Sequence, residues 1–465
     1  MPNDDTAIVV ALKPAPGDAT SAGKLGLWMC TALVVGNMIG SGIFLLPAAL
    51  AAYGPISIAG WLVTSTGAIV LALIFGRLAR LVPKTGGPYA YSREGFGDFA
   101  GFLIAWGYWI ALWAGNAAVA VAFSGYVGFL FPAIGASPLA GLATALAAIW
   151  LLTWINIRGV REAGAIQLVT TVLKVVPLLL IAVIGLAYVS PGNFTPVNVS
   201  QESNAAAIAA CAALTLWAFL GLESATVPAG DVTEPERTIP RATILGTSLA
   251  AVVYIAVTVV ALGVAPLAAL QTSSAPLADV AVVMWGAAGG TFIAVAACIS
   301  TFGTLNGFTM LTGQVPLGAA RDDLFPRQFA RLSKAKTPVF ALVVSNTLAS
   351  LLIAMNFTKG LVDQFVFIIL LATLTTLVPY LFCALAELMI YVTRGHTVAR
   401  QGLASIFGLA IVGFIYSAWA IYGAGQEIVF YGFLLLIAGV PVYVWLKWRN
   451  HTSESGTSVN QGDAT

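Results

Sequence analysis

Glycines break two membrane-length apolar runs, at Gly36-Asn37-Met38-Ile39-Gly40-Ser41-Gly42 and at Trp217-Ala218-Phe219-Leu220-Gly221-Leu222-Glu223. Glycine lets a helix unwind, and lipid cannot satisfy the N–H and C=O groups that unwinding frees. Such a break is tolerated only where it lines a cavity, and paired breaks mark a binding site near the bilayer midplane. The two stretches therefore predict a ligand-binding cavity between two broken membrane helices.

The composition is that of an integral membrane protein. Of the 465 residues, 59% are hydrophobic and 9% are charged, whereas about a quarter are charged in a typical soluble domain. Stretches of roughly 20 apolar residues recur, and each can span about 30 Å of hydrocarbon as a helix. We predict twelve spans, at about residues 25–52, 55–79, 98–131, 138–157, 164–189, 206–229, 242–266, 281–315, 338–356, 363–391, 403–422 and 428–446.

The basic residues orient these spans. If the N-terminus is cytoplasmic, 19 of the 21 Lys and Arg residues fall in inside segments, Lys359 lies outside, and Lys174 falls within a span. This asymmetry follows the positive-inside rule, and one missed or added helix would destroy it. We therefore expect a multi-pass protein of the cell membrane with both termini in the cytoplasm.

The ends and the cysteines are not expected to carry a site. Residues 1–23 and 449–465 are polar, cannot bury enough apolar surface to fold, and are expected to be disordered cytoplasmic tails around a membrane domain at 24–448. The four cysteines are interpreted as small buried hydrophobic residues, because all lie in apolar spans: Cys30, Cys211, Cys298 and Cys383.

The sequence offers no catalytic constellation. Its two histidines, His396 and His451, lie outside the predicted spans, which excludes a histidine-based triad or zinc site inside the membrane. The stretch from Gly36 to Gly42 lacks the Lys-Ser/Thr of a phosphate-binding loop. We expect no enzyme activity, no cofactor, no metal and no nucleic-acid partner. Transport by this chain would then be driven by an ion gradient or by exchange of solutes.

The positions of the two breaks predict an inverted repeat. They fall in spans 1 and 6, five helices apart, and these spans cross the membrane in opposite directions. This pattern is typical of a five-plus-five inverted repeat, here over about 25–189 and 206–391, with two helices at about 403–446 appended. Glycine also allows close helix packing in membranes, which remains the alternative for either break taken alone.

Four motifs follow one another along the chain: Gly36-Asn37-Met38-Ile39-Gly40-Ser41-Gly42-Ile43-Phe44-Leu45-Leu46-Pro47, Gly86-Gly87-Pro88-Tyr89-Ala90-Tyr91, Leu216-Trp217-Ala218-Phe219-Leu220-Gly221-Leu222-Glu223-Ser224 and Ala320-Arg321-Asp322-Asp323-Leu324-Phe325-Pro326. In this order they resemble the amino acid-polyamine-organocation (APC) transporter superfamily, within it the bacterial basic amino acid and polyamine antiporters. The resemblance implies an all-α, LeuT-like transporter domain at 24–448 with broken helices 1 and 6. It also implies alternating access in the bacterial inner membrane.

The resemblance also implies how a substrate is held. The carboxylate of an amino acid would meet the backbone N–H groups of Ser41 and Gly42, where a half-helix presents its positive end. Its ammonium would meet backbone carbonyl groups, and its side chain would lie in a pocket with Trp217 as a covering ring. The carbonyls belong to Met38, Trp217 and Leu220, and the pocket residues are Ala111, Asn116, Trp217, Phe308 and Ala372.

Two pocket positions depart from the antiporters that exchange arginine for agmatine. Those proteins carry a tryptophan at the position of Phe308 and a serine at the position of Ala372. An aromatic ring attracts a cationic side chain, and tryptophan does so best. The departures leave the identity of the substrate side chain open, and for Phe308 ordinary helix packing remains the alternative.

Glu223 is the strongest candidate for a gating residue. A carboxylate in mid-membrane costs roughly 2.5–3.5 kcal/mol on insertion scales, so it is rarely present without a purpose. The resemblance implies an inner gate in which Glu223 is hydrogen-bonded to Tyr108 and Tyr380, with Tyr89 as a further gating tyrosine. The alternative is a structural glutamate that ties helices together.

Lys174 lies about ten residues into span 5, too deep for its ammonium to reach the inner surface easily. The antiporters that this chain resembles usually have an apolar residue there. Proton-coupled permeases and several exchangers of the superfamily instead carry a lysine where related symporters hold sodium. Three functions follow: an amino acid/amine antiporter, which we favour, a proton-coupled permease, or a sensor that transports nothing. The substrate side chain, the stoichiometry, the direction and the oligomeric state, a homodimer included, stay open.

Overall fold

The computed structural model describes residues 25–82, 87–158, 173–226, 232–394 and 400–459, and these residues are almost entirely helical. The only extended pairing among them is an isolated bridge between Leu25 and Val232. The predicted tail at 1–23, residues 164–172 of the fifth predicted span and the last residues of the sixth lie outside the described residues. An all-helical chain is the expected solution in lipid, because a helix satisfies its backbone groups internally.

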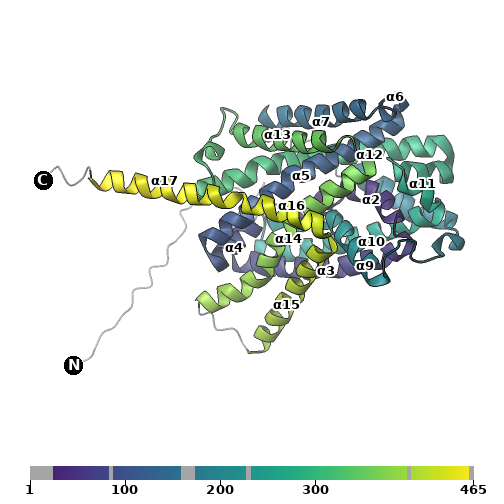
Figure 1. The fold of residues 1–465 in the computed structure, drawn as a ribbon. Coiled ribbons are helices and arrows are strands. Elements are labelled where there is room, and N and C mark those ends of the chain that lie inside the picture. Colours follow the sequence, from purple (N-terminus) through teal and green to yellow (C-terminus); the bar gives the residue numbers. More distant parts are fainter. Residues whose placement is uncertain (1–24, 83–86, 159–172, 227–231, 395–399, 460–465) are drawn as a thin grey trace.

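Ten helical segments in this part of the chain are long and apolar enough to cross a membrane, and two shorter apolar helices cover 173–188 and 339–355. The α-helices of Figure 1 are α1 (Leu27–Met38), α2 (Ser41–Ala51), α3 (Ser57–Leu81), α4 (Pro88–Phe96), α5 (Asp98–Leu130), α6 (Pro132–Gly135), α7 (Pro138–Arg158), α9 (Asn204–Leu216), α10 (Pro235–Val264), α11 (Leu267–Gln271), α12 (Pro276–Arg321), α13 (Val339–Asn356), α14 (Leu361–Arg394), α15 (Arg400–Gly423), α16 (Gln426–Ile437) and α17 (Gly439–Val459).

The first apolar run is interrupted where the sequence predicts. Helix α1 ends at Met38 and α2 begins at Ser41, with Ile39 and Gly40 in non-helical conformations between them. The second run breaks as well: α9 ends at Leu216, a 3-10 turn covers Trp217–Phe219, and Gly221 has a φ of +103°. Only glycine adopts this backbone conformation without a steric penalty, which explains its place in the break.

Helix α5 lies in the centre of the bundle and packs against α4, α7, α12, α13 and α14 (Figure 1). Almost its whole length is buried, whereas α7 and the α16–α17 pair expose apolar side chains such as Trp154 and Phe430. Since lipid is as apolar as these side chains, exposure there carries no penalty, and the buried interfaces depend on close packing and polar contacts.

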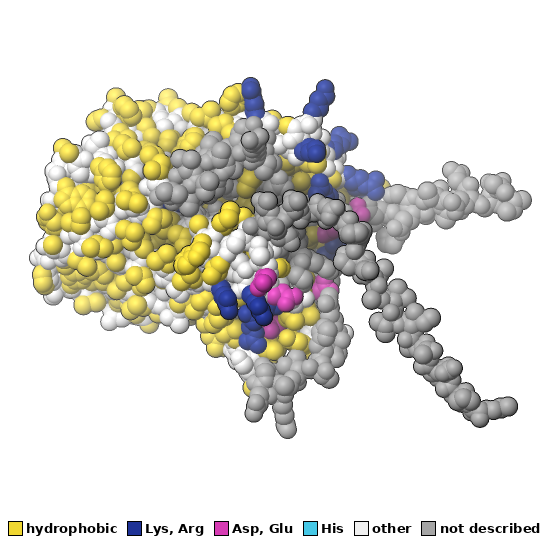
Figure 2. Space-filling view, turned by 180° about the vertical axis from the view of Figure 1, so that it is seen from behind, with side chains coloured by type: hydrophobic (Ala, Val, Ile, Leu, Met, Phe, Trp, Pro, Cys, Tyr) yellow, Lys and Arg dark blue, Asp and Glu magenta, His cyan; other side chains and the backbone are white. Residues whose placement is uncertain are grey.

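Charge is unevenly distributed over the surface. On the face drawn in Figure 2, Lys and Arg side chains gather toward one end and hydrophobic side chains cover most of the rest.

The four cysteines are free thiols, three of them buried and Cys298 half-buried.

Two features differ from the sequence prediction. Helix α17 continues to Val459, eleven residues past the predicted end of the membrane domain at 448, because extending an existing helix avoids the cost of nucleating a new one. Helix α12 spans 46 residues and bends at Gly286, where φ is +72°. The predicted span at 281–315 therefore covers only its middle.

Candidate functional site

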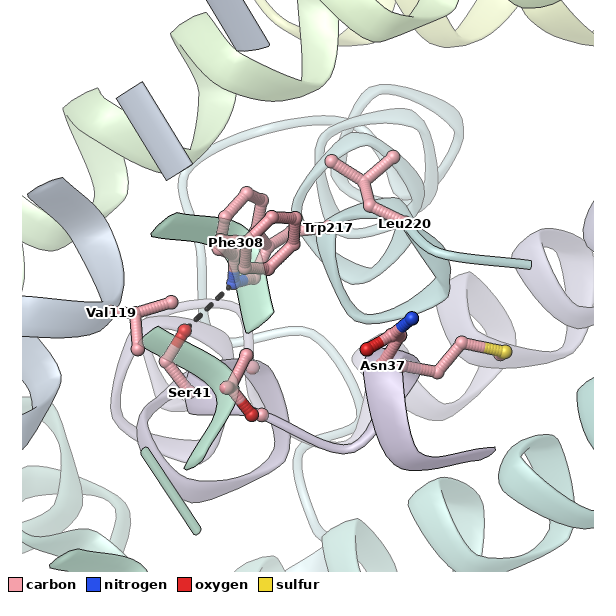
Figure 3. A pocket seen from close by; sticks show the side chains of 10 residues that line it. Asn37, Ser41, Val119, Trp217, Leu220 and Phe308 are labelled. Carbon is pink, nitrogen blue, oxygen red and sulfur yellow. Dashed lines mark hydrogen bonds between the residues drawn. The ribbon is translucent and has the colours of Figure 1, made fainter. Parts of the chain in front are cut away.

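A small cavity lies where the two breaks face α5 and α12 (Figure 3). Its volume is about 10 Å³, room for about one water molecule. The cavity is thus nearly filled by its own side chains. Its lining residues are Asn37, Met38, Gly40, Ser41, Gly42, Val119, Trp217, Leu220, Thr304 and Phe308.

Six of the residues predicted for substrate binding line this cavity: Met38, Ser41, Gly42, Trp217, Leu220 and Phe308. The other three, Ala111 and Asn116 on α5 and Ala372 on α14, are buried but do not line the cavity. Four lining residues were not predicted: Asn37, Gly40, Val119 and Thr304. The first two belong to the quoted break, and Thr304 lies one helical turn before Phe308, so helical periodicity alone could have indicated it.

The beginning of α2, at Ser41 and Gly42, forms part of the cavity wall. The first N–H groups of a helix have no intrahelical acceptor, and no side chain caps α2 at Gly40. Both glycines here permit close approach: a Cβ on Gly40 would lie 2.7 Å from Thr304 Cγ2, and one on Gly42 would lie 3.0 Å from Ala218 Cβ. The helix end therefore faces the second break directly, and it is chemically suited to an anionic group.

Two aromatic rings form the opposite wall of the cavity. Trp217 and Phe308 are stacked, with ring centroids 6.3 Å apart and an interplanar angle of 15°. Trp217 Nε1 donates a hydrogen bond to Ser41 Oγ at 3.2 Å, drawn as a dashed line in Figure 3. A Cβ on Gly115 would lie 3.2 Å from Trp217 Cη2, so the absence of a side chain on Gly115 leaves space for the indole.

Glu223 is buried among three hydrogen-bond donors. Tyr108 Oη donates to Glu223 Oε1 at 2.7 Å, Tyr380 Oη donates to Oε2 at 2.6 Å, and the N–H of Gly221 donates to Oε2 at 3.2 Å. The carboxyl group thereby joins α5, the second break and α14. Hydrogen bonding satisfies a group that would otherwise be costly to bury, and the geometry suits both a gate and a structural tie. The gating role stays a prediction.

Tyr89 lies in a different cluster. From α4 its hydroxyl donates to Asp322, which also pairs with Arg93 at 3.1 Å. Arg93 Nε contacts Asp98 Oδ1 at 3.0 Å, and Lys447 Nζ on α17 contacts Asp98 Oδ2 at 3.0 Å. These charged side chains connect α4, the start of α5, the end of α12 and α17.

Lys174 is fully buried, and its ammonium reaches the first break. Nζ donates to the carbonyl oxygen of Gly36, in the last turn of α1, and to Thr304 Oγ1 at 3.5 Å. Thr304 Oγ1 in turn donates to the carbonyl oxygen of Ile39 at 3.3 Å. The side-chain nitrogen of Lys174, whether it carries a permanent charge or gains and loses a proton, therefore contacts the same break that lines the cavity.

The sequence is similar to a known protein family and to several characterised or named relatives. Residues 25–445 match the model of a family described as amino acid permease. The chain is 34% identical to the putative arginine/ornithine antiporter of Bacillus subtilis, over 91% of this chain and 97% of that protein. It is 33% identical to the putrescine transporter PotE of Haemophilus influenzae, over 93% and 99%. It is 35% identical to the cadaverine/lysine antiporter of Escherichia coli, over 78% and 83%.

Proposed function

Since the chain belongs to the amino acid permease family, we propose that it is a secondary transporter that exchanges an amino acid for an amine across the bacterial inner membrane. The observation that carries this proposal is the cavity between the two helix breaks, walled by the N-terminal end of α2 and by stacked aromatic rings. The relative named for arginine/ornithine antiport supports a cationic amino acid as substrate, and the relative named for cadaverine/lysine antiport supports an amine as the solute exchanged for it.

Substrate recognition would divide between backbone and side chains. The N–H groups of Ser41 and Gly42 would bind the carboxylate, and carbonyl oxygens of Met38, Trp217 and Leu220 would bind the ammonium. None of the described residues that line the cavity is acidic, so a cationic side chain would be held by ring faces and dipoles. Because the rings fill the cavity, they must separate to admit a side chain, which would then approach Ala111, Asn116 and Ala372.

The remaining assignments belong to the same proposal. The helices would form twelve spans, with a five-plus-five inverted repeat, two appended helices and both termini in the cytoplasm. Glu223 with Tyr108 and Tyr380 would close the inner side of the cavity, with Tyr89 as a further gating residue. Alternating access would require these contacts to break and re-form in each cycle.

A second candidate function is a proton-coupled amino acid permease, and one observation favours it. The ammonium of Lys174 contacts the Gly36 carbonyl and Thr304, so that its protonation state acts directly on the first break. A group that alternates between charged and neutral forms at this position would couple proton movement to the shape of the cavity. Glu223 is the other candidate for carrying the proton.

Counterflow in proteoliposomes tests both functions. An exchanger takes up labelled ornithine or lysine only when the lumen contains amino acid or amine, whereas a proton symporter takes it up without internal substrate and acidifies the lumen. We expect the first result. Absence of both, over a panel of amino acids and amines, would leave the non-transporting sensor.

The same assay with Lys174→Ala identifies the role of the lysine. If Lys174 carries the coupled proton, the variant loses the pH dependence of uptake and keeps part of its exchange activity. If Lys174 only braces α1, uptake falls by the same factor at every pH. Rates are normalised to folded protein so that loss of stability is not read as loss of transport.

A further inference from the structure

Two buried asparagines meet behind the aromatic wall of the cavity. Asn116 on α5 and Asn346 on α13 are both fully buried. Asn116 Nδ2 donates to Asn346 Oδ1 at 2.9 Å and to Thr309 Oγ1 on α12 at 3.3 Å. Three helices are thus joined through one amide group.

The pair is left incompletely hydrogen-bonded. Within the part of the chain that the structure describes, Asn116 Oδ1 and Asn346 Nδ2 have no partner. The two amides share one N–H···O bond, which leaves the carbonyl oxygen of Asn116 and the NH₂ group of Asn346 over. Buried polar groups without partners are costly and uncommon, so this pair calls for a ligand.

The helices that carry Asn116 and Thr309 also contribute residues to the cavity. Gly115, the residue before Asn116, packs against Trp217, and Val119, one turn further along α5, lines the cavity. On α12, Thr309 directly follows Phe308, the ring that is stacked on Trp217. A substrate side chain that separates the two rings would therefore move toward the amides.

We propose that Asn346 is a positioning residue for substrate selection. By accepting the Nδ2–H of Asn116, it holds that amide with its carbonyl oxygen free to accept a hydrogen bond from the substrate side chain. The arrangement favours a side chain that ends in an ammonium group over an apolar side chain of the same length. This inference rests on the proposed function, because it assumes that the cavity binds an amino acid.

Ornithine and norleucine are the probes, since they differ only in an ammonium or a methyl group at the end of the side chain. We measure the dissociation constants of both for the purified full chain and for its variants. Asn346→Ala removes the acceptor that holds Asn116, and the preference for ornithine should fall roughly tenfold, as expected when a hydrogen bond to a charged group is lost. Asn346→Gln keeps a neutral amide acceptor that can reach Asn116 without adding a charge, and should retain more of the preference than Asn346→Ala.

Asn156→Ala is the matched control. Asn156 on α7 is also buried, and its Nδ2 donates to Asn306 Oδ1 on α12 at 3.0 Å, but it does not line the cavity. Its loss should reduce thermal stability and leave the ratio of the two dissociation constants unchanged. Should Asn346→Ala not fold, Asn346→Leu, which has the same branching and number of side-chain heavy atoms as asparagine, undergoes the same comparison.

Two results would overturn the role of Asn346. One is an unchanged preference in folded Asn346→Ala or Asn346→Leu protein, and the other is wild-type protein that binds norleucine as tightly as ornithine. Wild-type protein that binds no amino acid at all would instead contradict the proposed function.

Discussion

Trp217 and Phe308 occupy the space into which a substrate side chain would extend. Their stacked rings leave a cavity of about 10 Å³, far smaller than any amino acid. Binding therefore requires the rings to part, with the hydrogen bond from Trp217 to Ser41 as one contact that must adjust. The binding free energy therefore depends on whether contacts between the rings and the substrate are stronger than the contact between the two rings that they replace.

Truncating the larger ring tests this dependence. Trp217→Ala should weaken substrate binding by roughly 1–3 kcal/mol, because both apolar contact and cation–π attraction are lost. Trp217→Phe keeps a ring but loses the indole N–H, and should lose less. Phe308→Trp should shift the preference toward cationic side chains. Dissociation constants by calorimetry report each change, and unchanged affinity and selectivity in all three variants would show that the rings only pack helices.

At this scale the sequence predicted five lining residues that lie in the break motifs, together with Phe308 outside them, and missed Val119 and Thr304, which packing brings to the cavity. Ser41, Gly42 and Trp217 could be placed because they belong to the breaks themselves. Asn346 could not, because its importance depends on α13 lying against α5, and no feature of the α13 sequence indicates that neighbour.

At the scale of helices, the two breaks are in direct contact with each other. Gly221, in the second break, approaches Asn37 in the first, and a Cβ on Gly221 would lie 3.1 Å from Asn37 Cβ. The N–H of Gly221 also donates to Glu223, so the break is linked to the tyrosine pair on α5 and α14. We therefore expect a change in one break to reach the other break and the hydrogen bonds of Glu223.

Gly221→Ala should disturb both breaks at once. Its φ of +103° disfavours any side chain by about 1–3 kcal/mol, and the added methyl group would press on Asn37. Thermal unfolding and substrate binding of the purified variant should both be impaired. Gly318→Ala in α12 is the control: a Cβ there meets nothing within 4 Å, and alanine favours a helix by about 1 kcal/mol over glycine. Equal behaviour of the two variants would contradict the role assigned to Gly221.

Helix positions were well predicted from the sequence, because membrane thickness fixes the length of an apolar span. Glycine content was a poorer guide to bends. Gly286 bends α12 without a motif around it, whereas glycines such as Gly318 lie in regular helix. Whether a glycine unwinds a helix depends on the tertiary contacts that reward unwinding, and these are not visible in a single sequence.

For the whole molecule, the asymmetric distribution of charge is the basis of the predicted orientation. Figure 2 shows Lys and Arg gathered toward one end of the bundle, as the positive-inside rule expects for a cytoplasmic face. Lys359 is the exception in the predicted topology, and its ammonium lies 4.5 Å from the centre of the Phe367 ring, at the start of α14. Lys334 and Lys359 flank α13, so the prediction that they lie on opposite sides of the membrane requires α13 to cross it.

Cysteine labelling across α13 tests the orientation directly. The helix has 18 residues, which rise about 27 Å and so nearly match the hydrocarbon thickness. Lys334 and Lys359 are exposed on either side of it. With a membrane-impermeant maleimide on intact cells, we expect Lys359→Cys to react, and Lys334→Cys to react only after permeabilisation. Wild-type protein is the background control, because its cysteines are buried or half-buried. Reaction of both variants from outside would place α13 outside the membrane, and reaction of Lys334→Cys alone would invert the molecule and place its basic end in the periplasm.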